Sequence, residues 1–352
     1  MVRFLRERFN GLAPYHSPYL TEGVILNSNE SPYSVPEELV GYMKERIGEL
    51  FVNRYPDTDS LELANALAKA YDVKVTNIVC GVGSDELIDC VLGSTLESGE
   101  KVLMPYPSFS MYGQFTLLNS GQIIKVPLNS DFTYDVEAIK EAIKREQPKV
   151  IFLCNPNNPT GCIFTRAEIK SILEVAKGLV VVDEAYEEFS EKEISMIPYV
   201  NDYNNLIILK TFSKAYALAG ARLGYGIASE EVINLIHTVR PPYNVNIFSQ
   251  AIGTWAIEHR NLFLENARRI VDNRKMLEHG LKELGLMPYP SEANFVWLAL
   301  PEGIFEALEE KQIYIRKMKV DASTYYRINA GTLEENNKLL EVLKTLLKGG
   351  NI

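Results

Sequence analysis

Residues 150–161 read VIFLCNPNNPTG, an apolar run that ends in a loop of asparagines, prolines and one glycine. Similar apolar runs recur at residues 78–80, 102–104, 123–126, 179–182 and 206–209. None of them alternates between apolar and polar residues, so both faces of each predicted strand should be covered, as in a mainly parallel sheet. Helical patterns such as residues 85–96 and 166–177 separate most of the runs. This alternation predicts an α/β fold with a doubly wound sheet.

The pattern of predicted secondary structure changes after about residue 246. A long helical stretch with breaks covers residues 248–284, and strand-like pieces follow at 295–298, 313–316 and 326–329. A last amphipathic helix is predicted over residues 333–347. We therefore predict an N-terminal arm (1–35), a large domain (36–245) and a smaller α+β domain (246–352).

Composition limits the classes of partner. The 352 residues carry a formal net charge of −10, which argues against a nucleic-acid partner because such proteins present a basic face. No apolar run approaches the length of a membrane span, and the first residues lack the apolar core of a signal peptide. The four cysteines show no CxxC spacing, so we expect free thiols and no metal site. These features predict a cytoplasmic protein that does not bind membranes.

Polar loops follow four of the predicted strands. They cover residues 81–85 (GVGSD), 155–161 (NPNNPTG), 183–186 (DEAY) and 210–214 (KTFSK). Ligands of an open parallel sheet bind beyond the carboxyl ends of its strands. The four loops should therefore line one site.

Each of these features also has a purely structural explanation when it is taken alone. The glycines of residues 81–84 suit a plain strand-to-helix turn, and residues 155–161 suit a rigid turn. Asp183 could cap a helix, Lys214 could be an exposed lysine, and Arg222 could form a surface salt bridge. Their coincidence at one edge is what predicts a ligand site.

In this order and spacing, the motifs NPNNPTG (155–161), DEAY (183–186) and TFSKAYALAGARLGY (211–225) resemble the fold-type-I, aspartate-aminotransferase-like family of pyridoxal-5′-phosphate (PLP) enzymes. The resemblance extends from NSNE (27–30) to Arg327. It implies that family's fold, in which a large domain has a mainly parallel sheet flanked by helices and a smaller domain is α+β. It also implies PLP as the cofactor and transamination as the activity.

The resemblance assigns three catalytic residues. Lys214 would form the Schiff base with the cofactor and then carry a proton, which requires burial and positive charge to lower its pKa. Asp183 would pair with the pyridine nitrogen, and Tyr186 would hydrogen-bond the 3′ oxygen together with Asn158.

The resemblance assigns further residues to cofactor binding. A phosphate would lie at a positive helix end beside a guanidinium, in a cup formed by Gly83, Ser84, Asp85, Thr211, Ser213 and Arg222. Phe109 would stack on the ring where many relatives have tyrosine. Tyr55 matches a tyrosine that reaches the cofactor phosphate of the neighbouring subunit, which implies a homodimer.

Within the family, the sequence resembles the histidinol-phosphate aminotransferases. The segments LAPY (12–15), ILNSNE (25–30) and RPPYNVN (240–246) carry this resemblance, with Arg316 and Arg327. It implies transamination between histidinol phosphate and 2-oxoglutarate, giving imidazole-acetol phosphate and glutamate in histidine biosynthesis. Both partners are small anions, a phosphorylated amino alcohol and a 2-oxo acid. Tyr15, Asn158, Arg316 and Arg327 would bind them.

Other readings stay open at this point. Arg316 could be a surface cation, and Tyr15 could serve packing alone. An aminotransferase acting on aromatic amino acids, or a threonine-phosphate decarboxylase, shares this fold. A PLP-sensing regulator would need an appended basic DNA-binding module, and the chain has no such module.

Overall fold

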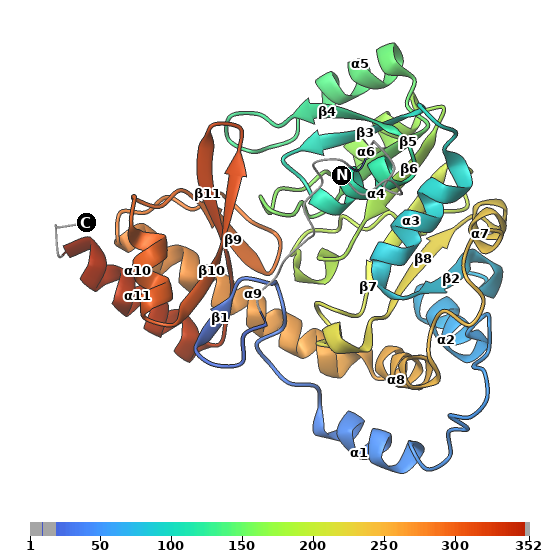
Figure 1. The fold of residues 1–352 in the computed structure, drawn as a ribbon, viewed down its shortest axis with the longest axis horizontal. Coiled ribbons are helices and arrows are strands. Elements are labelled where there is room, and N and C mark those ends of the chain that lie inside the picture. Colours follow the sequence, from blue (N-terminus) through green and yellow to red (C-terminus); the bar gives the residue numbers. More distant parts are fainter. Residues whose placement is uncertain (1–8, 10–18, 349–352) are drawn as a thin grey trace.

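The computed structural model describes residue 9 and residues 19–348, which form two sheets with helices around them (Figure 1). The strands are β1 (Val24–Leu26), β2 (Ile78–Gly81), β3 (Lys101–Tyr106), β4 (Gln122–Pro127), β5 (Val150–Cys154), β6 (Leu179–Asp183), β7 (Leu206–Thr211), β8 (Gly224–Ala228), β9 (Phe295–Leu298), β10 (Ile313–Val320) and β11 (Ser323–Asn329). The α-helices are α1 (Glu37–Arg46), α2 (Leu61–Tyr71), α3 (Gly83–Thr95), α4 (Ser110–Leu118), α5 (Val136–Glu146), α6 (Arg166–Leu173), α7 (Glu230–His237), α8 (Ile247–Glu258), α9 (Arg260–Glu283), α10 (Ile304–Glu310) and α11 (Leu333–Lys348). Short 3-10 helices are η2 (Val75–Asn77), η3 (Glu187–Phe189), η4 (Ile197–Tyr199) and η5 (Ala219–Ala221). Within the described residues, no helix is both long enough and apolar enough to span a membrane.

The larger sheet has seven strands in the order β2-β8-β7-β6-β5-β3-β4. Strand β8 runs antiparallel to its neighbours β2 and β7, and the remaining neighbours pair in parallel. Every residue of β5 and β7 is buried. The apolar runs of the sequence therefore mark strands that are covered on both faces, as predicted.

Two layers of helices supply that cover. Helices α3, α4 and α7 contribute buried side chains to one face of the sheet. Helices α2, α5, α6, α8 and α9 contribute to the apolar cluster on the other face. Three of the free cysteines, Cys80, Cys90 and Cys154, are buried in these apolar clusters. The predicted α/β fold with a mainly parallel sheet between helices is confirmed.

The smaller sheet has the order β1-β10-β11-β9. Strand β1 pairs in parallel with β10, and the other two pairings are antiparallel. Buried residues of α9, α10 and α11 form an apolar cluster with this sheet. In Figure 1, α9 passes from the larger sheet to the smaller one. Residues 24–26, which lie in the predicted N-terminal arm (1–35), thus form an edge strand of the smaller sheet.

Strand β8 was not predicted, because Gly224-Tyr225-Gly226 lacks an apolar run. A Cβ at Gly224 would lie 2.5 Å from both the carbonyl carbon of Gly83 and the nitrogen of Ser84. The glycine therefore lets β8 pass directly against the start of α3. The ends of several other elements differ from the sequence prediction: α6 ends at Leu173, β10 extends to Val320, and β11 begins at Ser323.

The predicted domain boundary lies just before α8. Helix α8 contacts α2, which belongs to the layer on the larger sheet. Helix α9 then contributes Phe263 and Ile270 to that layer and Leu277 and Leu281 to the cluster of the smaller sheet. We retain residues 36–245 and 246–352 as a proposed division, with α9 shared between the two cores.

Candidate active site

A cavity of about 390 Å³ lies at the carboxyl ends of β5, β6 and β7. Most residues that the sequence assigned to a site line it: Gly83, Ser84, Asp85, Phe109, Asn158, Asp183, Tyr186, Thr211, Ser213, Lys214, Arg222 and Arg327. They come from loops that are far apart in the chain. The parallel strands bring these loops together, as the rule for open α/β sheets predicts.

Asp183 is the last residue of β6 and is only 3% exposed. Its Oδ2 accepts a hydrogen bond from the Tyr112 hydroxyl at 2.7 Å, and its Oδ1 accepts one from the Ala185 N–H at 3.1 Å. Burial raises the pKa of Asp183 to about 6, although these two donors oppose the rise. The carboxylate is thus fixed in place, and a cation in the cavity would stabilise its ionised form.

Lys214 follows β7 and is partly exposed at the cavity wall. Its Nζ donates to the carbonyl of Ser28 at 3.1 Å. Burial, followed by the positive charge of Arg327, lowers the pKa of Lys214 to about 8. The predicted lowering of this pKa by desolvation and nearby positive charge is confirmed. A proton leaves this amine more easily than it leaves an ordinary lysine.

A second lysine, Lys210, lies four residues earlier and is 1% exposed. Its Nζ lies 2.8 Å from Glu187 Oε2, 3.0 Å from Glu188 Oε1 and 3.8 Å from Glu184 Oε2. Burial alone would lower the pKa of Lys210, but these carboxylates raise it well above its ordinary value. Lys210 is therefore held as a structural cation, and of these two lysines only Lys214 is suited to proton transfer.

A further group of residues in the cavity lining suits an anion. Gly83, the first residue of α3, has a φ of +74°, and a Cβ there would lie 3.0 Å from Arg222 Nη2. Arg222 Nη2 lies 3.6 Å from Asp85 Oδ2. The Thr211 hydroxyl donates to Ser213 Oγ at 3.0 Å and accepts from the Ser213 N–H at 3.1 Å. A helix N-terminus, a guanidinium and two hydroxyls are the donors that a phosphate requires.

Tyr186 and Arg327 are joined through Asn158. The Tyr186 hydroxyl accepts from Asn158 Nδ2 at 3.3 Å and from Asn29 Nδ2 at 2.9 Å. Arg327 Nη1 donates to Asn158 Oδ1 at 2.5 Å, and Nη2 donates to the carbonyl of Asn27 at 2.9 Å. Arg327 comes from β11, so the smaller sheet contributes a buried cation to a site built mainly by the larger sheet.

Two described residues that the sequence assigned to the site do not line this cavity. Arg316 lines an adjoining cavity of about 270 Å³, which shares Asp85, Phe109, Asn158 and Arg327 with the first. Tyr55 is 79% exposed on the surface of this chain. Tyr15 lies outside the described residues.

Sequence reasoning missed several residues of the site. Tyr112 bonds Asp183, and it lies on α4 one helical turn after Phe109, a spacing that could have suggested it. The carbonyl of Ser28 accepts a hydrogen bond from Lys214, and Asn29 donates one to Tyr186. Both residues belong to the segment NSNE (27–30), for which no role was predicted. Glu30 also lines the cavity. No local pattern signals the long-range contacts of Ser28 and Asn29.

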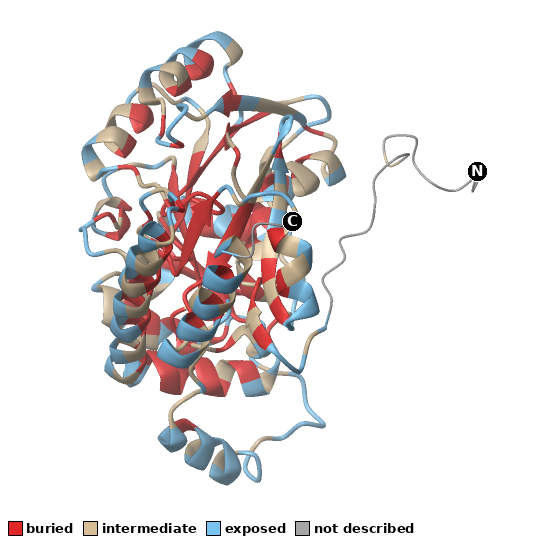
Figure 2. Cartoon of the chain, turned by 90° about the vertical axis from the view of Figure 1, so that its left-hand side faces the viewer, coloured by how far each residue is buried: buried red, intermediate tan, exposed pale blue. Residues whose placement is uncertain are grey.

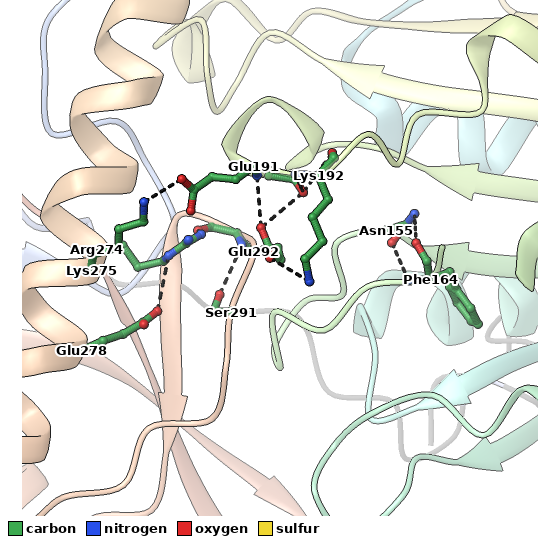
Figure 3. A network of polar contacts seen from close by, with 11 residues as sticks. Asn155, Phe164, Glu191, Lys192, Arg274, Lys275, Glu278, Ser291 and Glu292 are labelled. Carbon is green, nitrogen blue, oxygen red and sulfur yellow. Dashed lines mark hydrogen bonds and ion pairs between the residues drawn. The ribbon is translucent and has the colours of Figure 1, made fainter. Parts of the chain in front are cut away.

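The turn that carries Asn158 is bonded to the segment that precedes β9. The Glu292 N–H donates to the carbonyl of Gly161 at 2.9 Å. Figure 3 shows Glu292 between Glu191 and Lys192, with its Oε1 3.2 Å from Lys192 Nζ and its Oε2 accepting the Glu191 N–H at 3.1 Å. Residues 291–292 are thus bound on both sides by loops that follow β5 and β6.

Gly161→Ala should lower the free energy of unfolding by about 2–4 kcal/mol. Gly161 has a φ of +79°, and its Cβ would lie 2.2 Å from Ser291 Oγ and 2.9 Å from Ser291 Cα. Urea unfolding would measure the loss. Gly285→Ala is the control, because Gly285 has a similar φ of +78° with no atom within 4 Å of an added Cβ, so strain alone remains. Equal effects of the two substitutions would contradict the close contact.

Comparison with known proteins decides the family. The family model for aminotransferase class I and II matches residues 21–343. The chain belongs to this family. The histidinol-phosphate aminotransferase of Ruminiclostridium cellulolyticum is 39% identical over 96% of this chain and 97% of its own. A crystal structure of a putative histidinol-phosphate aminotransferase from Erwinia carotovora is 27% identical, covers 93% of this chain and 96% of its own, and has a TM-score of 0.87. The Sinorhizobium meliloti histidinol-phosphate aminotransferase, solved with pyridoxal-5′-phosphate, has a TM-score of 0.91 at 23% identity, covering 99% of each chain.

Class I and II aminotransferases use PLP, so the predicted enzyme class and cofactor are confirmed. The cavity fits that cofactor. Glycines at positions 83 and 224 leave the space that a Cβ would fill beside the helix end and Arg222. A buried carboxylate with a raised pKa and an amine with a lowered pKa line the same cavity.

Proposed function

We propose that this aminotransferase transfers the amino group of histidinol phosphate to 2-oxoglutarate, giving imidazole-acetol phosphate and glutamate in histidine biosynthesis. The similarity to curated histidinol-phosphate aminotransferases over nearly the whole chain supports this choice of substrate. The structural observation that carries it is the buried Arg327, which lies in one cavity with Lys214 and Asp183. The guanidinium gives the substrate's anionic group a fixed partner near the reacting amine.

The site residues would divide the work as follows. PLP, when bound, supplies an electron sink for the charge left on the substrate's Cα after its proton is removed. Lys214 Nζ removes that proton and returns one, which its lowered pKa favours. The Asp183 carboxylate holds a proton on the pyridine nitrogen by ion pairing. Tyr186, with Asn158, would hold the 3′ oxygen, and Phe109 would lie against the ring. The cup of Gly83, Ser84, Asp85, Thr211, Ser213 and Arg222 binds the phosphate.

Two arginines would receive the anionic groups of both substrates in turn. Arg327 and Arg316 are paired in register on the adjacent strands β11 and β10. Both line the smaller cavity beside Phe109 and Asn158. Guanidinium groups bind phosphate and carboxylate alike through paired N–H donors, so one site can accept a phosphate and then a dicarboxylate. Tyr15 is proposed as a further hydroxyl donor.

We also propose that the enzyme is a cytoplasmic homodimer in which Tyr55 reaches the partner's cofactor phosphate. Exposed apolar side chains support such an interface: Val40 and Met43 on α1, and Ile47, Phe51 and Val52 after it. Figure 2 shows α1 at the lower end of the molecule, with most of its residues exposed. Tyr55 is exposed close after this segment in the chain. An exposed apolar group of this kind is typical of a protein–protein interface.

An amino-donor panel tests the proposed substrate. Glutamate formation from 2-oxoglutarate would be followed with histidinol phosphate, histidinol, phenylalanine and tyrosine as donors. We expect the highest kcat/KM for histidinol phosphate and a large loss for histidinol, which lacks the phosphate. A preference for phenylalanine or tyrosine would instead indicate an aromatic aminotransferase, and carbon dioxide release from phosphothreonine would indicate a decarboxylase.

Arg327→Gln should lower kcat/KM for histidinol phosphate by about 10²–10³-fold, because a buried charged hydrogen bond to the substrate is lost. Activity with histidinol should fall much less, since it has no phosphate. Lys317→Gln is the control, because Lys317 lies beside Arg316 on β10 but pairs with exposed Glu306 at 2.7 Å. Equal losses with both donors would contradict a phosphate-binding role for Arg327.

A further inference from the structure

Residues 240–246 (RPPYNVN) lie outside the cavity, yet they are anchored to the turn that begins its phosphate end. Asn244 Nδ2 donates to Glu86 Oε2 at 2.6 Å and to the carbonyl of Cys80 at 3.3 Å. The same Glu86 oxygen accepts the Val82 N–H at 2.7 Å. Asn244 and Glu86 therefore fix the backbone between β2 and α3, immediately before Gly83.

The other side of this segment is anchored to the loop that carries Tyr55. Arg240 Nη2 donates to Asp59 Oδ1 at 3.3 Å, while Nη1 of the same guanidinium donates to Asn244 Oδ1. Gln250 Nε2, on α8, donates to the carbonyl of Asp57 at 2.8 Å and to that of Val245 at 3.0 Å. Residues 57 and 59 are thereby held against the segment.

An aromatic pair completes the connection. The rings of Tyr55 and Tyr243 are stacked, with centroids 4.4 Å apart and planes 20° apart. Tyr243 adopts a φ of +57°, a left-handed conformation that a tyrosine rarely takes. The backbone is held in this conformation between Arg240 and Asn244, and it directs the Tyr243 ring onto Tyr55. The pair is exposed, at 43% for Tyr243 and 79% for Tyr55.

We propose that residues 240–246 act as a clamp, in which Tyr243 positions Tyr55 for the cofactor phosphate of the partner subunit. This inference rests on the proposed homodimer. Tyr243 is a positioning residue here, because it acts through Tyr55 and not on the cofactor itself. The clamp also holds the chain's own phosphate-binding turn through Asn244 and Glu86. One segment thus supports the phosphate end of both sites of the dimer.

The dissociation constant for PLP, measured by the absorbance of the bound cofactor, tests the clamp. Tyr243→Ala should weaken PLP binding by about 2- to 10-fold, the effect of losing one aromatic pair. Tyr243→Phe keeps the ring and should bind PLP as the wild type does. Asp59→Asn, at an exposed ion-pair partner of Arg240, should weaken binding in the same direction if Tyr243→Ala does not fold. Unchanged PLP affinity in both Tyr243→Ala and Asp59→Asn would overturn the clamp.

Tyr55→Phe separates this inference from the proposed dimer role. If Tyr55→Phe binds PLP as tightly as the wild type, the proposed contact of Tyr55 with the partner's phosphate fails, and the clamp fails with it. If Tyr55→Phe weakens PLP binding and Tyr243→Ala does not, only the clamp fails.

Hybrid dimers show whether the clamp serves the other subunit. One hybrid joins a Lys214→Ala chain to a Tyr243→Ala chain. The other joins a Lys214→Ala/Tyr243→Ala chain to a wild-type chain. Each contains one Lys214 and one Tyr243, so only their distribution differs. We expect normal PLP affinity at the Lys214 site of the first hybrid and weakened affinity in the second. The reverse order would show that Tyr243 acts within its own chain and would overturn the proposal.

Discussion

Lys214→Ala should abolish transamination, lowering kcat by at least about 10⁴-fold, because it removes both the amine that binds the cofactor and the proton carrier. The lysine lies in one cavity with Asp183, and its pKa is lowered to about 8. No described side chain offers a second amine there, since Lys210 is enclosed by carboxylates. Single-turnover measurements with histidinol phosphate would give the residual rate.

The same substitution should leave the cofactor-free protein at least as stable as the wild type at pH 7. Burial and Arg327 lower the pKa of Lys214 to about 8 in the folded state, below the roughly 10.4 of an unfolded chain. Between these values the unfolded state binds more protons, so this lysine makes stability rise with pH. Below pH 8 the folded protein bears the cost of a partly buried ammonium, and alanine removes that cost.

Lys210→Ala provides the contrast. It would leave Glu184, Glu187 and Glu188 without their shared cation, and breaking a buried ion pair in this way costs about 3–5 kcal/mol. Thermal unfolding at pH 7 should therefore show a lower midpoint for Lys210→Ala than for the wild type. The midpoint of Lys214→Ala should not be lowered. Substantial turnover in Lys214→Ala would contradict the assignment of the catalytic lysine.

The strands of the larger sheet could be predicted because burial on both faces leaves an unbroken apolar run, as in residues 150–154. Strand β8 could not, because Gly224 and Gly226 are set by the close approach of α3 and of Val79, which no local pattern records. Strand β1 was missed for a similar reason. Its three residues gain strand geometry from pairing with β10, almost 300 positions away in the chain.

The residues of the site also divide into those that local sequence patterns predict and those that they do not. Asp183 ends a strand, and Lys214 and Asn158 come shortly after strands, so sheet topology brings them together. Asn29 reaches the site through a contact that depends on tertiary packing, so no local pattern predicts its role. For Tyr112, only the spacing from Phe109 points to the site. The role proposed for Tyr55 needs a second chain.

Asp183→Asn should weaken PLP binding by about 2–5 kcal/mol, or roughly 30- to 5,000-fold, since it removes one charge of a buried pair. Asparagine keeps the size of the side chain and an oxygen that can accept from Tyr112. The loss would therefore report the charge and not a cavity. Tyr112→Phe is the matched variant, because it keeps the carboxylate and removes one of its two described donors; it should cost much less.

The pH dependence of Asp183→Asn separates the charge from other effects. Burial raises the pKa of Asp183 to about 6 in the cofactor-free protein, against roughly 3.9 unfolded. Between these values the folded state binds more protons, so this carboxyl makes stability fall as pH rises, by on the order of 3 kcal/mol in total. The free energy of unfolding of Asp183→Asn, measured in urea at several pH values, should not show this fall. PLP needs the ionised carboxylate. Below pH 6 the PLP affinity of the wild type should therefore fall relative to that of Asp183→Asn, and the fall should approach about tenfold per pH unit. Parallel pH profiles for the two proteins would show that Asp183 does not pair with the pyridine nitrogen.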